Sequence, residues 1–75
     1  MQRLAKSKIK ILGQNIARLR TQAGLSQERL AELAEIHVRF LQKVEGWELG
    51  ASLAVLVRLK KVLKCSWEDL LAGVD

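Results

Sequence analysis

Residues 24–46, GLSQERLAELAEIHVRFLQKVEG, decide the fold, because they hold two short helical patterns with almost nothing between them. Apolar side chains recur at helical spacing in both patterns: Leu30, Leu33 and Ala34, then Ile36, Leu41 and Val44. Both narrow stripes must face one core, and residues 34–36 are too few for an antiparallel return. The stretch therefore predicts two helices, over about 27–34 and 38–45, that meet at a sharp corner.

The residues at the corner are less favourable than they could be. Glu35 occupies the turn, where a positive φ is expected and a non-glycine residue costs about 1 kcal/mol. His37 is expected to cap the second helix, a role that Ser, Thr, Asp or Asn performs better. Ser26 is a good cap for the first helix, since its hydroxyl can accept from backbone N–H groups two or three residues on.

Three further helices are expected around the corner. An apolar stripe before it predicts a helix from about residue 9 to residue 23, which Gly24 closes: Leu12, Ile16, Leu19 and Ala23. After the corner, Ser52 begins a helix with four inward leucines: Leu53, Leu56, Leu59 and Leu63. Ser66 caps a short last helix that ends at Gly73, with Asp69 placed for a capping box. The chain is predicted to be all-α, a compact five-helix domain with a helix-turn-helix.

The 75 residues are predicted to form a basic N-terminal arm over 1–8, which is polar and has little periodicity, and a helix-turn-helix domain over 9–75. The formal net charge is +5, and residues 1–20 carry six bases and no acid: Arg3, Lys6, Lys8, Lys10, Arg18 and Arg20. This positive field is expected of an N-terminal segment that lies near a polyanion. A merely solvated basic tail is the alternative.

Several classes of function are not expected. The single histidine, His37, has no Cys or Ser partner at a recognisable spacing and no Cys or second His as a metal ligand, so neither enzyme activity nor a metal or cofactor site is expected. Cys65 lies among apolar residues and reads as a buried structural thiol suited to a reducing cytoplasm. No signal peptide or membrane span is visible, and we expect no role at a membrane.

The motifs of the chain have a familiar order. Leu25-Ser26-Gln27 is followed in register by a second set of matching positions: Leu30-Ala31, Ile36, Leu41, Val44 and Glu45. Over about residues 9–72 this resembles the phage-repressor and Cro type of helix-turn-helix regulator, also called the xenobiotic-response-element family. The resemblance implies a lambda-repressor-like fold. The chain departs from that family at three positions. Glu35 stands where the family usually has Gly, and His37 where it usually has Ser or Thr. Ala51 stands where Pro is common.

Transferred onto this chain, the resemblance implies a base-reading face on the second helix of the corner: Val38, Arg39, Gln42 and Lys43, with His37 at its start. Arg39 could donate two hydrogen bonds to guanine, Gln42 could read adenine, and Val38 could pack on a thymine methyl group. Lys43 could reach a guanine or a phosphate. An ordinary solvated helix face is the alternative for each polar residue.

Phosphate contacts are expected from two places. The resemblance implies that Gln27 binds a DNA phosphate beside Ser26 and the free N–H groups of the helix start. Lys6, Lys8 and Lys10 are expected to add charge from the N-terminal segment. The resemblance also implies a salt bridge between Arg20 and Glu45 that ties the first helix to the third.

The leading hypothesis is a sequence-specific DNA-binding transcriptional regulator that reads a pseudo-palindromic operator as a homodimer. Surplus apolar side chains are expected to form the dimer surface: Trp47, Leu49, Val55, Trp67, Leu70, Leu71 and Val74. The alternative is an antitoxin-like or adaptor module that binds a partner protein through its apolar C-terminal surface.

Overall fold

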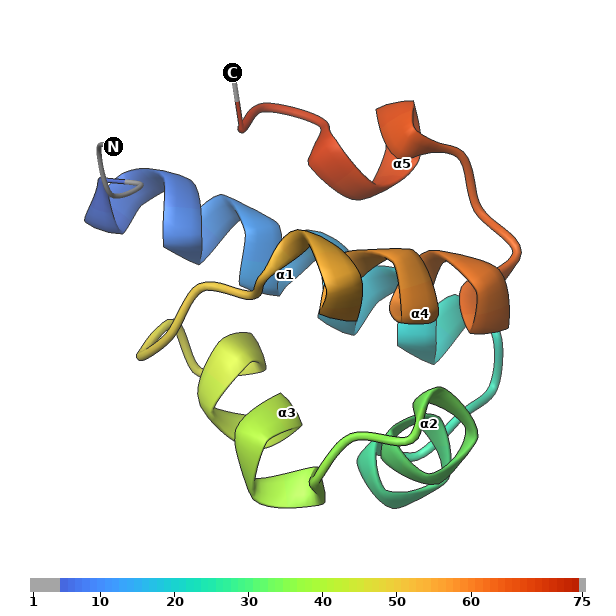
Figure 1. Cartoon of the computed structure of the whole chain (residues 1–75). Helices are drawn as coiled ribbons and strands as arrows, with labels where there is room; N and C mark the ends of the chain where they lie inside the picture. The colour runs from blue at the N-terminus through green and yellow to red at the C-terminus, as the bar shows by residue number, and fades with distance from the viewer. Residues whose placement is uncertain (1–4, 75) are drawn as a thin grey trace.

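The computed structural model describes residues 5–74, and these residues form five helices and no strand. The helices are α1 (Lys6–Gln22), α2 (Gln27–Ala34), α3 (Val38–Glu45), α4 (Leu53–Leu63) and α5 (Trp67–Leu71). In Figure 1, α1 and α4 lie across the middle of the molecule, α2 and α3 lie below them, and α5 lies above. The predicted all-α, five-helix class is confirmed.

The corner between α2 and α3 forms where the sequence predicts it. Glu35 lies in the left-handed region with φ 57°, and Arg58 Nη1 of α4 donates to its carbonyl oxygen over 3.2 Å. His37 caps α3, because its Nδ1 accepts from the Arg39 N–H over 3.1 Å. Ser26 Oγ accepts from the Arg29 N–H over 3.0 Å and caps α2. A left-handed glutamate and an unusual histidine cap are therefore accommodated.

Helix α1 begins three residues earlier than predicted, at Lys6 rather than at residue 9. The Ala5 carbonyl oxygen accepts from the N–H groups of Lys8 and Ile9 over 2.9 and 3.1 Å. The hydrogen bonds of the helix therefore begin before residue 9. Lysine and isoleucine alternate over residues 8–11 with the two-residue period of a strand, so the sequence pattern does not indicate a helix there. Residues 1–4 of the predicted arm, with Arg3, lie outside the described residues.

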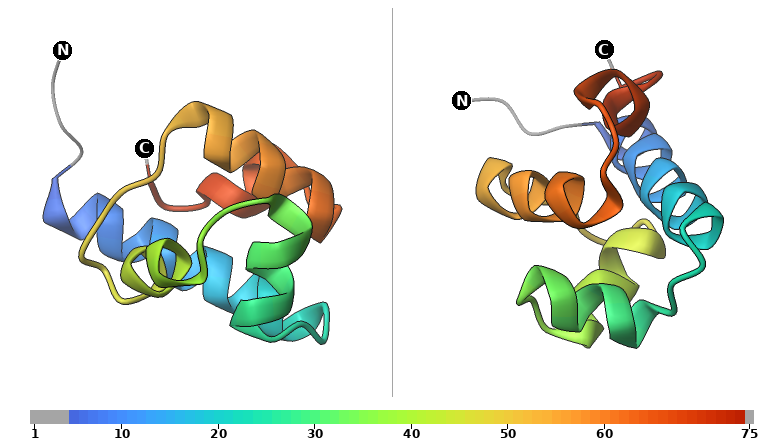
Figure 2. Two further views of the ribbon diagram at one scale, coloured as in Figure 1. Left: turned by 60° about the horizontal axis from the view of Figure 1, so that its bottom comes forward. Right: turned by 90° about the vertical axis from the view of Figure 1, so that its right-hand side faces the viewer.

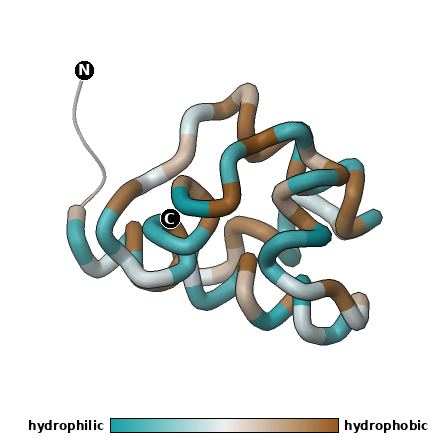
Figure 3. Tube along the Cα trace, turned by 90° about the horizontal axis from the view of Figure 1, so that it is seen from below, coloured by the Kyte–Doolittle hydropathy of each residue, from teal (hydrophilic) through white to brown (hydrophobic). Residues whose placement is uncertain are grey.

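The core is made by the inward stripes of the helices, with buried side chains at Leu12, Ile16, Leu30, Ala31, Ala34, Leu41, Val44, Leu56, Leu59 and Leu70. Hydrophobic and hydrophilic segments alternate along the helices in Figure 3, as expected for amphipathic helices around one core. The predictions that Leu33 and Leu53 face inward are wrong, since these residues are 42% and 71% exposed. Leu53 is the first residue of α4, and the buried face of that helix begins only one turn later.

Asn15 ties α5 to α1 from inside the molecule. Its Nδ2 donates to the carbonyl oxygens of Leu70 over 2.9 Å and Ala72 over 2.8 Å, at the C-terminal end of α5. A helix of five residues is too short to be stable by itself. The capping box of Ser66 and Asp69 at its start and the Asn15 amide at its end supply the missing hydrogen bonds. The sequence alone does not predict this role of Asn15.

Gly13 lets α1 and α3 approach each other more closely than any other residue would allow. A Cβ atom at this position would lie only 2.4 Å from the Val44 carbonyl oxygen and 3.1 Å from Trp47 Cδ1. The right-hand view in Figure 2 shows α1 passing close to the end of α3. The missing side chain therefore sets the distance between the two helices.

A salt bridge closes the same junction nearer the C-terminal end of α1. Arg20 Nε donates to Glu45 Oε2 over 2.8 Å and Arg20 Nη2 to Glu45 Oε1 over 3.0 Å, while Nη1 donates to the Leu25 carbonyl oxygen over 2.8 Å. The side chains are only 18% and 5% exposed. The hydrogen bond to Glu45 raises the pKa of Arg20 above its usual value. The pair that the family resemblance implies is thus present, and all three polar nitrogens of Arg20 are used.

Replacing Gly13 by Ala is expected to lower the free energy of unfolding by about 1–3 kcal/mol, because the added methyl group overlaps a backbone oxygen. Alanine is usually preferred to glycine inside a helix by about 1 kcal/mol, which acts in the opposite direction. We expect the cost of the overlap to exceed this preference. Chemical denaturation measures the difference. Gly50→Ala is the control, since its new methyl group meets only Ile9 at 3.7 Å. A stabilised Gly13→Ala protein contradicts the close contact.

Arg20→Met is expected to lower the free energy of unfolding by about 3 kcal/mol, because it leaves the buried Glu45 carboxylate without its partner. The double replacement Arg20→Met/Glu45→Leu should recover most of this loss, since it leaves no unpaired charge. Urea denaturation of the three proteins gives both numbers. A double variant that is as unstable as Arg20→Met would show that hydrogen bonds to the backbone, rather than the charge pair, hold the junction.

Candidate nucleic-acid interface

Helix α3 separates its side chains into a buried and an exposed face. Leu41 and Val44 are buried in the core, whereas Arg39, Gln42 and Lys43 are exposed. The three exposed residues recur at three- and four-residue spacing and so share one side of the helix. Of the predicted base-reading residues, the structure thus brings these three together on a free surface.

Val38 and His37 lie at the start of α3 in different environments. Val38 is half-buried and packs against the core, so only part of its side chain remains for an outside contact. His37 is exposed, but its Nδ1 is occupied by the cap on the Arg39 N–H. Nε2 is the ring nitrogen that remains for a further partner.

The exposed face of α3 is cationic. Arg39 and Lys43 lie one turn apart, a spacing at which like charges repel and slightly destabilise a helix. The acid of the helix, Glu45, is turned toward α1 and is engaged by Arg20. The face therefore presents two cations and a neutral amide, which suits a polyanion with acceptor groups.

The start of α2 supplies a second group of donors. Gln27 is the first residue of α2 and is half-buried, and its Nε2 donates to Glu45 Oε1 over 3.0 Å. Ser26 Oγ accepts from the Arg29 N–H, so its hydroxyl hydrogen is still available to an outside acceptor. Backbone N–H groups in the first turn of a helix also lack partners within the helix. These groups together suit a phosphate oxygen.

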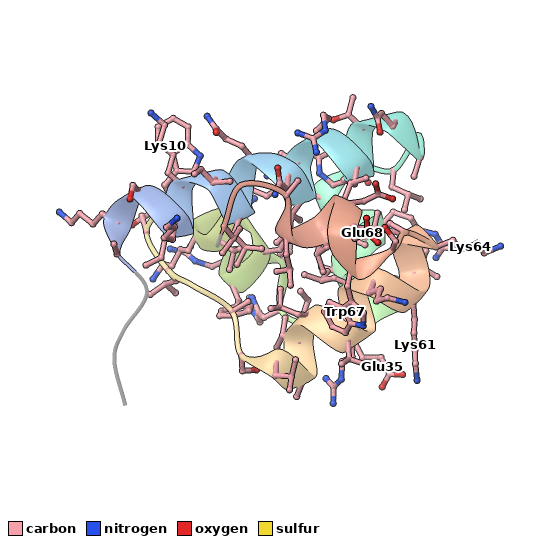
Figure 4. The ribbon with its side chains drawn as sticks, turned by 90° about the horizontal axis from the view of Figure 1, so that it is seen from above. Lys10, Glu35, Lys61, Lys64, Trp67 and Glu68 are labelled. Carbon is pink, nitrogen blue, oxygen red and sulfur yellow. The ribbon has the colours of Figure 1, made fainter. Side chains whose placement is uncertain are left out.

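The N-terminal lysines lie on the first turns of α1. Lys6 and Lys10 are exposed and Lys8 is half-buried. Lys10 Nζ lies 4.7 Å from the centre of the Trp47 ring, a cation–π distance, and Trp47 follows the end of α3 by two residues. Figure 4 shows Lys10 at one end of the molecule and Lys61 and Lys64 at the other. Lys10 thus lies at the side of the molecule where α3 ends.

The residues predicted to form the dimer surface have three different fates. Trp47, Leu49, Trp67 and Leu71 are exposed, and Val55 and Val74 are half-buried. Leu70 is wrongly assigned, because its side chain is 0% exposed and belongs to the core. It lies one residue before Leu71 and therefore on a different side of α5, the side that packs on α1. The exposed members come from two places, the α3–α4 connection and α5, which are well separated in Figure 1.

Other chemistry is sparse in the part of the chain that the structure describes. No group of three or more His, Cys, Asp or Glu side chains over residues 5–74 could hold a metal ion. Cys65 is half-buried, and burial raises the pKa of its thiol, as expected for a structural rather than a reactive cysteine. None of the described helices is both long enough and apolar enough to cross a bilayer.

Comparisons with known proteins agree with this geometry. The family model described as "Helix-turn-helix" matches residues 16–70. The control protein C.SmaI of Serratia marcescens is 38% identical over 61 residues, which cover 81% of this chain and 73% of that protein. The crystal structure of the restriction-modification controller protein C.AhdI from Aeromonas hydrophila superimposes with a TM-score of 0.81 at 31% identity, over 85% of this chain and 97% of that one. The chain therefore belongs to the helix-turn-helix family and is a DNA-binding transcriptional regulator.

Proposed function

We propose that the protein binds a pseudo-palindromic operator as a homodimer, with α3 of each subunit in the major groove. The observation that carries this proposal is the exposed row of Arg39, Gln42 and Lys43, opposite the buried Leu41 and Val44. An α-helix fits the major groove, and base edges there present acceptors to such donors. Two copies of α3 would meet successive grooves about 34 Å apart.

Each side chain of α3 has a role that follows from its chemistry. Arg39 donates to O6 and N7 of a guanine, and Gln42 makes the paired donor and acceptor contact that adenine offers. Lys43 reaches a guanine or a phosphate, and the exposed part of Val38 packs on a thymine methyl group. His37, held by its cap, contributes Nε2 at the edge of the groove.

Phosphate contacts position α3 in the groove. Gln27, Ser26 and the N–H groups of the first turn of α2 hold one phosphate. Lys6, Lys8 and Lys10 on α1 add cations beside the end of α3, and Lys10 is kept in place by the Trp47 ring. Cations close to phosphates release counterions from DNA, so binding is expected to weaken steeply as salt rises.

The names of the two similar proteins narrow the biological role. Both are called control or controller proteins, and one name specifies restriction-modification. We propose the same class of role for this chain, as a regulator without a catalytic step of its own that acts on DNA in the cytoplasm.

Dimerisation would cover apolar side chains that this small domain leaves in water. Trp67 and Leu71 of α5 are exposed, and α5 lies on the opposite side of α1 and α4 from α3 in Figure 1. Lys60 Nζ lies 5.5 Å from the centre of the Trp67 ring and covers part of it. We place the dimer contact there rather than at Trp47, which stacks with Lys10 beside the end of α3 and would be close to DNA. The same α5 surface would fit an apolar surface of another protein, so partner binding is the second candidate function.

Arg39→Ala is expected to weaken specific binding by about 1–3 kcal/mol and to relax the base preference at one operator position, with the fold unchanged. Fluorescence anisotropy on duplexes that differ at single base pairs measures both effects. Lys61→Ala removes one exposed positive charge from α4, outside the exposed row of α3, and should have little effect. Equal losses for the two variants would mean that Arg39 acts only through its charge.

Trp67→Glu is expected to convert the dimer to a monomer, because it places a charge in an apolar contact. Sedimentation velocity over a range of protein concentrations gives the oligomeric state. Leu53→Glu, which alters an exposed apolar residue on α4, is the control and should remain dimeric. If the unaltered protein stays monomeric at high concentration, the homodimer proposal fails and the α5 surface is better assigned to another protein.

A further inference from the structure

The Glu45 carboxylate has more partners than a simple salt bridge needs. It accepts from Arg20 Nε and Nη2 on α1 and also from Gln27 Nε2 on α2, over 2.8, 3.0 and 3.0 Å. One carboxylate at the end of α3 therefore joins three helices. The two hydrogen bonds from Arg20 are those that hold α1 against α3. The hydrogen bond from Gln27 therefore has a separate role.

The third hydrogen bond restricts the side chain of Gln27. A glutamine on a helix surface ordinarily samples several rotamers, and holding it in one has an entropic cost when it binds a ligand. Here Nε2 is already held by Glu45 Oε1 before DNA arrives. An amide nitrogen carries two hydrogens, so one N–H still remains for an acceptor outside the protein.

The electrostatic balance makes this arrangement compatible with a phosphate. A bare carboxylate so close to the amide would repel a phosphate oxygen bound there. The Arg20 guanidinium neutralises Glu45 through two hydrogen bonds, and the pair together carries no net charge. Glu45 can therefore orient Gln27 without opposing the approach of the DNA backbone.

We propose that Glu45, neutralised by Arg20, is a positioning residue that preorganises Gln27 to donate to a DNA phosphate. This rests on the proposed function, in which Gln27 contacts a phosphate. It assigns Glu45 a part in DNA affinity in addition to its part in stability. The salt bridge at the α1–α3 junction then also sets the geometry of the phosphate contact at the start of α2.

The test is a double-mutant cycle on DNA affinity in the full-length protein. One change is Gln27→Ala, and the other is the joint replacement Arg20→Met/Glu45→Leu, which removes the acceptor but keeps the formal net charge at +5. The probes are a fluorescently labelled mixed-sequence duplex and a duplex selected by the unaltered protein. The joint replacement should weaken binding about two- to tenfold when Gln27 is present and should have no effect in the Gln27→Ala protein.

Two further readouts separate positioning from general damage. The loss should be the same on both duplexes and at every salt concentration, because a phosphate contact carries no sequence information and a neutral amide releases no counterion. In the DNA-free protein, the NMR signals of the Gln27 side-chain amide should move toward those of a solvated glutamine after the joint replacement. If the joint replacement does not fold, Glu45→Gln is used, which keeps one acceptor oxygen but raises the net charge by one. The added charge acts with or without Gln27, so the expected result is that Glu45→Gln changes affinity less favourably in the protein that has Gln27 than in Gln27→Ala, by less than the joint replacement would.

Three results overturn the inference. The first is an equal loss of affinity with and without Gln27, which would mean that the junction only holds the fold. The second is an unchanged affinity or unchanged Gln27 amide signals after the joint replacement. The third is a Gln27→Ala protein that binds as tightly as the original, since there would then be no contact to preorganise. This last result leaves the regulator function itself standing, because base reading is tested separately through Arg39.

Discussion

The contact between α1 and α3 is the constraint on which the rest of the structure depends. At one end of it, Gly13 lets the Val44 carbonyl oxygen approach the backbone of α1, and at the other, Arg20 and Glu45 form a salt bridge. A helix of eight residues is not stable alone, so α3 exists because its apolar face is held on this junction. The angle at which α3 presents its outer face follows from the same contact.

The corner between α2 and α3 then places the second set of donors. Because Glu35 adopts a left-handed conformation, α2 turns back so that its first residue, Gln27, comes within hydrogen-bonding distance of Glu45 at the far end of α3. Arg58 of α4 stabilises this turn, because its Nη1 donates to the Glu35 carbonyl oxygen. The exposed row on α3 and the start of α2, for which we propose base reading and phosphate binding, are thus parts of one arrangement, as recognition of a fixed DNA geometry requires.

Local patterns in the sequence predicted much of this arrangement. The bounds of α2 and α3, the positive φ of Glu35 and the caps at Ser26 and Ser66 follow from rules that involve only neighbouring residues. The exposed row on α3 follows from the helical period of its apolar residues. The link between Arg20 and Glu45 came from a family resemblance, since nothing local to either residue requires it.

The features that the sequence did not predict depend on contacts between distant segments. Apolar character alone cannot show that Leu53 begins its helix outside the core or that Leu70 turns into it. Gly13 and Asn15 look unremarkable in the sequence, yet one lies against α3 and the other caps the end of α5. The hydrogen bond from Gln27 to Glu45 joins residues 18 apart, and its partner could be found only once the corner was built.

The central claim is that two copies of α3, each fixed by its α1 contact, read DNA in adjacent major grooves. Selection of bound duplexes from a random-sequence pool tests it most directly. We expect an enriched motif of two inverted half-sites whose centres lie about 34 Å apart, one turn of the DNA helix. A pool that remains random, or an enriched motif without inverted repetition, would contradict it.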